Sequence, residues 1–558
     1  MRQHEHLMPD PAIPQSASPS VDCIVIGHND VDFATFSDNQ KEFATRSAGY
    51  NEIVTNSVRI DGRRQTYMEL LNTILERVDD SAHELNTFRV PSLAVLYLVN
   101  FLRGKGLRAE GINFFNSAHH QLAKLLADKP ACVAITTTYY VDDDPIREII
   151  AFIRGFNRDT KIIVGGPRIL SLCNGQPERI QTLTFKSIGA DIYVESSQGE
   201  ATLALVAQTL TGGGDLANIP NLTFRAPDGT FIRTPRVKED NGLEENIIDW
   251  ARMPAGSFTP INYVRTARSC PFACEFCNYP AMAGAHTFLS VAAIEQELRV
   301  LKLAGVRDVV FIDDTFNVPF PRFKDICRMM IRNKFGFRWV SFFRCSSCDE
   351  EALDLMQESG CLGVYLGIES GDAQILKNMH KFARIERYRE SVAKMSERGI
   401  LSLASMIIGF PGETPETVQR SINFLNEAKP SFYNVQVYYH DTQAPIEKRR
   451  EEFGITGSGY SWRHSTMDWR EAIELKEKML REVRYSLQMP LYGFSIWTVP
   501  YLLQSGLSMD QILDFTRFAN SVSHAELRGE AVDLDDRIQK LISRPLWLRS
   551  ADRHMQVA

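Results

Sequence analysis

The stretch Arg268-Ser-Cys-Pro-Phe-Ala-Cys-Glu-Phe-Cys-Asn-Tyr-Pro280 places three cysteines, Cys270, Cys274 and Cys277, on one short loop. Their C-x3-C-x2-C spacing offers three thiolates, whereas a cubane iron–sulfur cluster accepts up to four sulfur ligands. A cubane held by only three protein thiolates keeps its fourth iron open to a substrate. The alternatives are three unrelated buried thiols or a zinc loop, although structural zinc sites usually supply four closed ligands.

The chain after this loop alternates strand-like and helix-like segments. The strand-like segments are residues 261–267, which lead into the loop, and 309–314, 338–344, 363–371, 403–413 and 432–439. Helical segments fill the gaps between them, including residues 350–359 and 414–426. Six such repeats predict a partial (β/α)6 barrel over residues 261–450, with its function at the carboxyl ends of the strands.

A second α/β pattern precedes the loop. Short apolar runs with the composition of buried parallel strands occupy residues 21–30, 107–114, 131–138, 161–166 and 190–195. Helical patterns between them, such as residues 91–103 and 145–156, predict an N-terminal doubly wound, Rossmann-like sheet over residues 21–205. Ligands of such sheets bind beyond the carboxyl ends of the strands.

The rest of the chain has weaker patterns. The polar residues 1–20, rich in Pro and Ser, are expected to form a disordered tail. Residues 206–260 are expected to be a linker with a small hairpin at residues 227–229. Residues 451–558 carry amphipathic helical patterns and predict a helical C-terminal cap. This cap either shapes the substrate pocket, by closing the open side of the barrel, or serves packing alone.

Composition narrows the class of protein. The 558 residues carry a net charge of -7 and are 44% hydrophobic, so a large core can form and no basic face for nucleic acid is expected. Ten cysteines in a chain of this length do not suggest a disulfide framework. Without a signal peptide or an apolar run of about 18 residues, we expect a cytoplasmic protein with neither membrane nor nucleic-acid partners.

The motifs together resemble a known family. The three cysteines, with Phe276 directly before the last of them, are similar to the cluster loop of the radical S-adenosylmethionine (SAM) superfamily. The upstream order of a hydroxyl-ended strand, a Gly-Gly-Pro strand and a Gly-Glu strand resembles the cobalamin-binding domain that precedes many radical SAM domains. A generic flavodoxin-like domain is the alternative. The resemblance covers roughly residues 21–450 and implies a [4Fe-4S] cluster, SAM and cobalamin as cofactors.

The resemblance also implies roles for residues at the strand ends. The cluster ligands would be Cys270, Cys274 and Cys277, and the residues around SAM would be Phe276, Asp313, Asp314, Arg344, Glu369 and Ser370. The nucleotide tail of cobalamin would be held by Thr136, Thr137, Thr138, Gly165, Gly166, Gly199 and Glu200.

Within the SAM set, the two aspartates would accept from the SAM amino group, and Arg344 would pair with its carboxylate. Glu369 and Ser370 would lie on the ribose side, with the turn at residues 409–413 beside the adenine. A structural role for the aspartates and an ordinary ion pair for Arg344 are the alternatives.

Two features depart from related patterns. The D-x-H-x-x-G motif that supplies a lower axial histidine is absent after the first strand, and His28 lacks that spacing, so we expect cobalt without a histidine below it. The polar residues 33–90 either cover the lower face of the cobalt or form a solvated excursion. Cys345 and Cys348 form a second C-x2-C pair, which is either a metal site or two ordinary thiols.

The resemblance is strongest to class B radical SAM methyltransferases. In that class a 5′-deoxyadenosyl radical takes a hydrogen atom from an unactivated position, methylcobalamin gives the methyl group, and a second SAM restores it. Residues 311–319 and 329–339 are most similar to the branch with phosphinate P-methyltransferases and natural-product C-methyltransferases. This implies a small-molecule or peptide substrate, methylated on carbon or phosphorus, and an electron donor such as flavodoxin or ferredoxin.

Three other functions compete with this hypothesis. A cobalamin radical enzyme could form or contract a ring without methyl transfer. A methylthiotransferase acting on tRNA is disfavoured, because the chain has no second cysteine triad upstream and no basic terminal domain. A non-catalytic corrinoid or redox-sensing protein would not cleave SAM.

Overall fold

The structure is a computed structural model that describes residues 21–547 apart from residues 30–31, 45–46, 61, 80–82, 141, 240, 254 and 346–347. The predicted tail at residues 1–20 lies outside the described residues. The chain forms two compact units. Of the described residues, the first unit contains those within 21–30 and 91–257, and the second contains those within 31–90 and 258–547.

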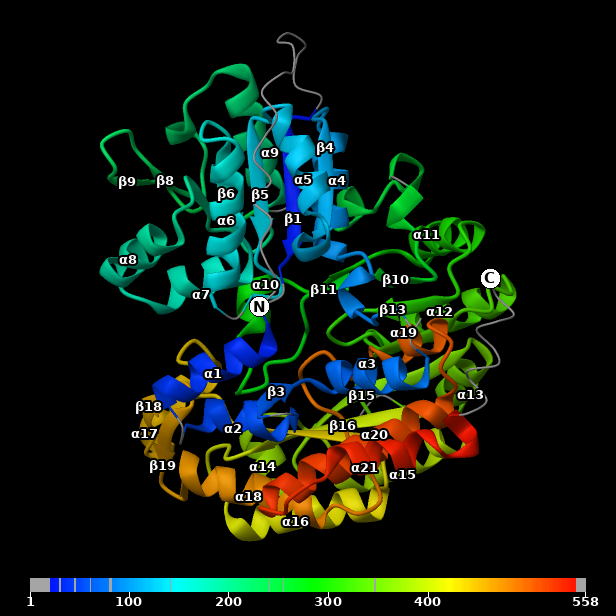
Figure 1. Ribbon diagram of the computed structural model, residues 1–558. Helices are drawn as coiled ribbons and strands as arrows, with labels where there is room; N and C mark the ends of the chain where they lie inside the picture. The colour runs from blue at the N-terminus through cyan, green and yellow to red at the C-terminus, as the bar shows by residue number, and fades with distance from the viewer. Residues whose placement is uncertain are drawn as a thin grey trace. The chain divides into compact units, whose positions relative to one another are not determined.

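The first unit is built on a seven-stranded sheet in the order β4-β1-β5-β6-β7-β8-β9 (Figure 1). Its strands are β1 (Cys23–His28), β4 (Ala109–Phe114), β5 (Cys132–Thr136), β6 (Lys161–Gly165), β7 (Ile192–Val194), β8 (Leu222–Arg225) and β9 (Phe231–Arg233). The first five strands in this order are parallel, and β8 and β9 are antiparallel to their neighbours. Parallel strands are buried on both faces, which explains their continuous apolar sequences.

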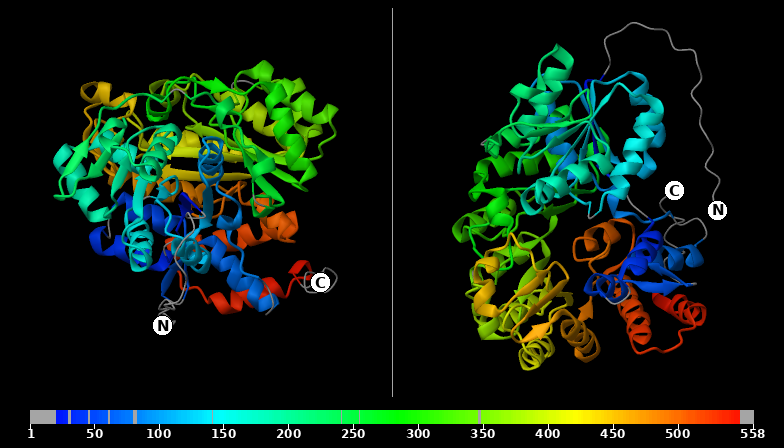
Figure 2. Two further views of the ribbon diagram at one scale, coloured as in Figure 1. Left: turned by 90° about the horizontal axis from the view of Figure 1, so that it is seen from above. Right: turned by 90° about the vertical axis from the view of Figure 1, so that its left-hand side faces the viewer.

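Helices cover both faces of this sheet (Figure 2). One face packs against α4 (Leu93–Gly104) and α9 (Glu200–Gly212). The other face packs against α5 (His119–Ala127), α6 (Asp144–Phe156), α7 (Pro167–Gly175) and α8 (Glu178–Ile188). The predicted doubly wound domain is therefore confirmed.

The sheet extends into the residues expected to be a linker. Helix α9 ends at Gly212, and β8 and β9 then form a hairpin on the edge of the sheet. The turn at residues 226–230 is closed by a hydrogen bond from the Ala226 N–H to the Thr230 carbonyl at 2.8 Å. The hairpin was expected, but not its pairing with β7, because pairing with a distant strand leaves no local sequence signal.

The second unit is built on a parallel sheet in the order β10-β13-β14-β15-β16-β17-β21. Its strands are β10 (Ile261–Val264), β13 (Asp308–Phe311), β14 (Arg338–Phe343), β15 (Cys361–Glu369), β16 (Leu401–Ile408), β17 (Phe432–Val437) and β21 (Leu487–Gln488). The first six match the predicted strands. The seventh comes from the region predicted to be a cap, and its two residues are too short to give a sequence pattern.

Helices follow these strands and complete the partial barrel. They are α11 (Val291–Leu303), α12 (Phe320–Arg332), α13 (Glu350–Glu358), α14 (Ala373–Asn378), α15 (Ile385–Glu397), α16 (Pro415–Ala428) and α18 (Trp469–Glu482). Asp349, Thr414 and Asp468 begin three of them by accepting hydrogen bonds from first-turn N–H groups. Smaller elements are β11 (Ala267–Arg268), α10 (Tyr279–Ala283), β12 (Thr287–Phe288), α17 (Arg450–Phe453), β18 (Thr456–Ser458), β19 (Ser461–His464) and β20 (Met467–Asp468).

The inner face of this sheet is partly open. These strands are mostly buried but carry a few half-buried side chains, and the register between neighbouring strands places pairs such as Phe342 and Tyr365, or Ile407 and Gln436, on one face. The half-buried set is Tyr263, Ile312, Phe342, Tyr365, Ile407 and Gln436. The alternate residues, such as Trp339, face outward and pack against Phe316 and Phe323. A period of two is the pleat of a strand, so the half-buried set lines the barrel lumen.

Residues 31–90 fold onto the second unit. They form α1 (Phe33–Ala44), α2 (Ala48–Thr55), β2 (Val58–Ile60), β3 (Arg63–Gln65) and α3 (Tyr67–Val78). Helix α3 packs its apolar face against the C-terminal helices α19 (Val499–Gln504), α20 (Met509–Leu527) and α21 (Leu534–Ile542). The Glu52 carboxylate pairs with Lys476 at 2.7 Å and accepts from the Val437 N–H at 2.7 Å. The segment is therefore an integral part of this unit, not a solvated excursion.

Within the described part of the chain, none of the helices combines the length and the apolar character that crossing a membrane requires.

Candidate functional site

The three predicted cluster cysteines lie together on the loop between β11 and α10. The N–H of Cys277 donates to the carbonyl of Cys274 at 3.1 Å, which closes a tight turn between these two thiols. Cys274 is buried, whereas Cys270 and Cys277 are half-buried. Ser269 takes a left-handed conformation with φ +70° and anchors the loop through its hydroxyl, which donates to the Gly284 carbonyl at 2.7 Å.

The thiols influence one another, as closely spaced ionisable groups do. Burial raises the pKa of the Cys277 thiol to about 11, and the neighbouring Cys274 and Cys270 add to that rise. The thiols do not converge on one point: in the described residues, no three His, Cys, Asp or Glu side chains are placed to hold a single ion. A cubane instead offers each thiolate its own iron, and its positive charge would offset the cost of the thiolates.

Glu275, between two of the cysteines, fixes the loop and was not singled out from the sequence. Its buried carboxylate lies 2.9 Å from His380 Nδ1 and 3.7 Å from the Arg449 guanidinium. Its N–H donates to the Met379 carbonyl at 3.0 Å, and its carbonyl accepts from the Ile446 N–H at 3.0 Å. We call these contacts the Glu275 clamp. The sequence signal that could have identified Glu275 is its position between two of the predicted ligand cysteines.

Phe276 contacts the turn that follows the fifth strand. Its ring lies edge-on to Phe410 at 6.4 Å between centroids, and Lys381 Nζ is 5.7 Å from its centroid. Gly409 begins this turn with φ +92°, and the Glu413 carboxylate accepts from the Gly409 N–H at 2.6 Å. Burial raises the pKa of Glu413 to about 8, so this side chain is protonated at neutral pH.

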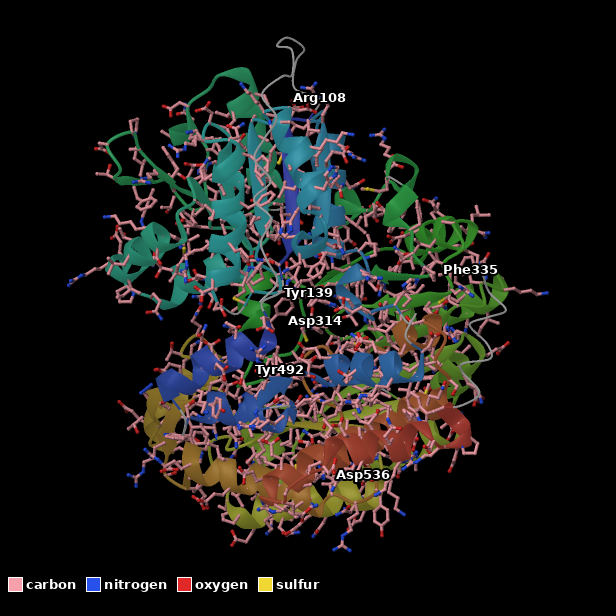
Figure 3. The ribbon with its side chains drawn as sticks, viewed as in Figure 1. Arg108, Tyr139, Asp314, Phe335, Tyr492 and Asp536 are labelled. Carbon is pink, nitrogen blue, oxygen red and sulfur yellow. The ribbon has the colours of Figure 1, made fainter. Side chains whose placement is uncertain are left out.

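The two aspartates after β13 have different surroundings. Asp313 is buried, and its carboxylate accepts from the N–H groups of Thr266 at 2.6 Å and Ala267 at 2.9 Å. It ties the second strand to the first, which is the structural role considered as the alternative. Asp314 is exposed and is a hydrogen-bond partner of the Tyr279 hydroxyl. Desolvation raises its pKa to about 6, although the hydrogen bond with Tyr279 acts in the opposite direction, and Figure 3 marks its position.

Arg344 contacts the cluster loop through an aromatic ring. Its guanidinium carbon lies 3.7 Å from the centroid of the Phe272 ring, a cation–π contact. It also donates to the Lys381 carbonyl. Its N–H donates to the Asn317 side-chain oxygen at 2.9 Å. The sequence does not predict the contacts of Arg344 with Phe272 and Asn317, because no spacing along the chain relates either residue to Arg344.

Glu369 and Ser370, at the end of β15, point to different neighbours. Glu369 has φ +66° and accepts from Lys381 Nζ at 2.7 Å. A side chain on Gly367 would meet both members of this pair, at 2.5 and 2.8 Å, so the bare glycine gives them room on the lumen side. Ser370 is fully buried, with its hydroxyl 3.4 Å from that of Ser421. Ser370 therefore supports the strand end, and Lys381 is an additional charged residue of the site.

The first unit contains a cavity at the carboxyl ends of its strands. Of the residues predicted there, Thr136, Gly165, Gly166 and Gly199 line it, together with the apolar residues Leu98, Ala134, Ile135, Ile163, Val194, Leu203 and the polar Gln198. A Cβ on Gly166, which has φ +106°, would lie 2.9 Å from Thr137 Oγ1. A Cβ on Gly165 would lie 3.1 Å from the Val194 Cβ. We call this cavity the glycine cradle, because only glycines leave it open.

Two of the other residues predicted for this cradle, Thr137 and Thr138, hydrogen-bond to residues that line it or lie next to it. Thr137 donates through Oγ1 to the Gly165 carbonyl at 2.9 Å and accepts from the Arg168 N–H at 3.1 Å. Thr138 is exposed, and its hydroxyl lies 3.1 Å from that of Thr136. Glu200 is buried in the first turn of α9 and does not line the cavity. Apolar walls with a hydroxyl and bare backbone at the mouth fit a flat, largely apolar group with a polar attachment.

Residues 264–425 match the model of the radical SAM superfamily, and this range contains the cluster loop, the two aspartates and the fourth-strand residues. This part of the chain is a radical SAM domain, and enzymes with such a domain use a [4Fe-4S] cluster and SAM. The predicted resemblance is therefore confirmed over this range, and the zinc-loop alternative is set aside.

Relatives extend the similarity beyond that domain. The chain is 28% identical over 348 residues to an uncharacterized methyltransferase of Pyrococcus horikoshii, covering 60% of this chain and 72% of the relative. It is 23% identical over 384 residues to the anaerobic magnesium-protoporphyrin IX monomethyl ester cyclase of Rubrivivax gelatinosus, covering 65% and 66%. The match thus spans 72% and 66% of the lengths of these two relatives.

A solved structure shares the fold. The radical SAM methyltransferase TsrM from Kitasatospora setae, with cobalamin and a [4Fe-4S] cluster bound, is 20% identical and superposes with a TM-score of 0.51. The superposition covers 65% of this chain and 72% of that chain. At this identity the likeness concerns the fold, and it confirms the predicted α/β architecture.

Proposed function

We propose that this chain is a cobalamin-dependent radical SAM methyltransferase that methylates an unactivated carbon or a phosphinate phosphorus of a small molecule or peptide. The observation that carries the proposal is that one chain contains both a three-thiol loop on an open parallel barrel and a glycine cradle on a doubly wound sheet. The relative of the same fold binds both corresponding cofactors.

The residues present fit the two cofactors. Cys270, Cys274 and Cys277 would hold the cluster, and the glycine cradle would hold the nucleotide tail of cobalamin, with Thr137 and Thr138 as braces. When bound, the cluster would supply the electron that cleaves SAM, and cobalamin would supply the methyl group. The protein would position these groups and exclude water.

The residues around the barrel mouth would orient SAM. The Asp314 carboxylate, which is ionised above pH 6, would accept from the SAM amino group. Arg344 would pair with the SAM carboxylate while its guanidinium remains on Phe272. The Glu369–Lys381 pair would offer a carboxylate to the ribose hydroxyls, and Phe276 would contact the adenine.

The lumen residues would form the substrate site. The aromatic side chains Phe342, Tyr365 and Trp497 pack together there, with ring centroids 4.7 to 5.9 Å apart. The Tyr365 hydroxyl accepts from the Asn434 side chain at 3.0 Å. A largely apolar lumen suits a radical reaction, because it keeps water away from the reactive position.

The proposal is tested with anaerobically reconstituted protein, hydroxocobalamin, a reductant such as reduced flavodoxin, and SAM carrying a labelled methyl group. Deoxyadenosine and a labelled product should form together with a true substrate, whereas Cys274→Ala should form neither. Cys348→Ala is the matched control, because Cys348 is also half-buried but lies outside the loop. Reconstituted protein that binds cobalamin but does not cleave SAM would contradict the proposal and favour a non-catalytic corrinoid protein.

Ring formation is the second candidate function, and the 23% identity to a cyclase of Rubrivivax gelatinosus favours it. Both reactions would use the same residues at the barrel mouth. The mass of the product separates them, because methyl transfer adds a methyl group and cyclisation does not.

A further inference from the structure

An aromatic cluster lies at the carboxyl ends of three neighbouring strands of the first unit, β4, β1 and β5. It consists of His28, Phe114, Tyr139 and Tyr140. The His28 ring stacks on Phe114 at 6.1 Å between centroids and meets Tyr139 edge-on at 5.6 Å. Tyr140 lies 5.6 Å from His28 on a third side. We call this group the strand-end aromatic cluster.

Tyr139 is the member of this cluster that faces solvent. Its exposed fraction is 47%, whereas His28 and Tyr140 are each 7% exposed. Its ring packs edge-on against the buried His28, so the cluster presents part of an aromatic side chain at the strand ends. Figure 3 labels Tyr139 at the end of its strand.

The cluster adjoins the glycine cradle. Tyr139 is three residues beyond Thr136, whose side chain lines the cradle, and β1 is the neighbour of β5 on the side away from β6. Ligands of doubly wound sheets lie across the carboxyl ends of the strands. A macrocycle whose tail occupies the cradle would therefore extend over the ends of β5 and β1, where its sheet-facing side would meet Tyr139.

The chemistry of the cluster does not favour a metal ligand. Burial lowers the pKa of His28 to about 4, so its imidazole is neutral, and three rings enclose it. Desolvation raises the pKa of the Tyr139 hydroxyl, so this phenol stays protonated at neutral pH. A neutral phenol is a poor donor to cobalt, and His28 cannot reach the surface while the Tyr139 ring covers it.

We propose that Tyr139 covers the lower face of the cobalt of bound cobalamin as a platform, without coordinating it, and keeps His28 from doing so. This inference rests on the proposed function, because it requires cobalamin in the cradle. It assigns the lower face to a residue of β5's own loop, and residues 31–90, which pack on the other unit, are not needed for it.

The test is electron paramagnetic resonance of the chain loaded with cob(II)alamin. The wild-type protein should show no nitrogen splitting, because neither His28 nor the cofactor's own base lies below the metal. In Tyr139→His, an imidazole takes the place of the platform, and a three-line nitrogen splitting should appear. Tyr485→His is the matched control, since Tyr485 is 63% exposed in the other unit, and it should give the wild-type spectrum.

A second variant keeps the inference testable if Tyr139→His folds poorly. Tyr139→Ala removes the cover, so either water or the uncovered His28 imidazole should reach the metal, and the visible absorbance of bound cob(II)alamin should shift away from that of the wild-type protein. Hydroxocobalamin should also bind up to about tenfold more weakly, as expected for loss of one aromatic contact.

The outcomes separate the two proposals. Nitrogen splitting in the wild-type protein, or a fully loaded Tyr139→His protein without splitting, would overturn the platform while leaving cobalamin binding intact. An unchanged absorbance in loaded Tyr139→Ala would overturn it as well. A wild-type chain that binds no cobalamin would overturn the proposed function itself, and with it the premise of the platform.

Discussion

The cluster loop of the second unit and the glycine cradle of the first are built by different means. The loop is fixed by side chains from distant parts of the chain: Glu275 to His380 and Arg449, and Phe272 under Arg344. The cradle is fixed by close backbone approach, where Gly165 leaves space beside Val194 and Gly166 leaves space beside Thr137. This difference suits the two proposed cofactors. A small, charged cluster needs directed contacts, whereas the large and mostly neutral tail of cobalamin needs a cavity of matching shape. Four substitutions test this comparison.

The largest effect is expected at the cluster loop itself. Cys274→Ala leaves two thiolates, which cannot hold a cubane, so iron and sulfide content and SAM cleavage should fall to background, a loss of at least about a thousandfold. Cobalamin binding should stay within twofold, because the cradle belongs to the other unit. If Cys274→Ala lost both the cluster and cobalamin, the two sites would not be independent, and the comparison would fail.

The second-largest effect is expected at the glycine cradle, where the single methyl group added by a Gly→Ala substitution should weaken cobalamin binding. Gly166→Ala places a Cβ 2.9 Å from Thr137 Oγ1 at φ +106°, so cobalamin affinity should fall roughly a hundredfold, about 3 kcal/mol, while cluster content stays unchanged. Gly189→Ala is the matched control, because Gly189 also has a positive φ, +83°, but has nothing within 4 Å of the added Cβ. Equal losses in the two variants would show that strain, not space, matters. Equilibrium titration with hydroxocobalamin measures both.

A smaller, pH-dependent effect is expected at Asp314. Its pKa is raised to about 6, and only the ionised carboxylate accepts from an ammonium group, so SAM affinity should fall as the pH drops from 8 to 5. Asp314→Asn should weaken SAM binding about tenfold at pH 8 and flatten the profile. Asp313→Asn, at the buried neighbour, should lower thermal stability without removing the pH dependence. A sloping profile in Asp314→Asn would assign the titration elsewhere.

The smallest effect is expected at the Glu275 clamp. Glu275→Gln keeps the shape but removes the charge that faces His380 and Arg449, which should cost about 1 kcal/mol and release the cluster to a chelator about fivefold faster. Glu386→Gln, an exposed residue of α15, is the control and should match the wild type. Unchanged release in Glu275→Gln would show that the clamp stabilises the fold but not the cluster.

The difference between the two regions also explains what the sequence could predict. The cysteine spacing, the strand pattern and the Gly165-Gly166 pair are local signals, and each was found from the chain alone. The partners of Glu275, at residues 380 and 449, lie more than a hundred residues away and have no periodicity that points back to the loop. The sequence therefore does not predict such long-range side-chain contacts.

Other gaps have the same physical origin. The packing of α3 against α20 and α21 joins residues more than 400 positions apart, so residues 31–90 seemed to have no core of their own. The different roles of Asp313 and Asp314 follow from a side-chain direction at a strand end, which sequence alone does not give. The burial of the Ser370 hydroxyl likewise depends on the direction of a side chain at a strand end, which the sequence does not give.

The central claim is that three thiolates hold a cubane whose remaining iron is free to bind SAM. Mössbauer and electron paramagnetic resonance spectroscopy of the anaerobically reconstituted, reduced chain, with and without SAM, tests it most directly. We predict a [4Fe-4S] signal that changes when SAM is added and is lost in Cys274→Ala but kept in Cys348→Ala. A loop that carries zinc, or a cluster signal that is indifferent to SAM, would contradict the claim.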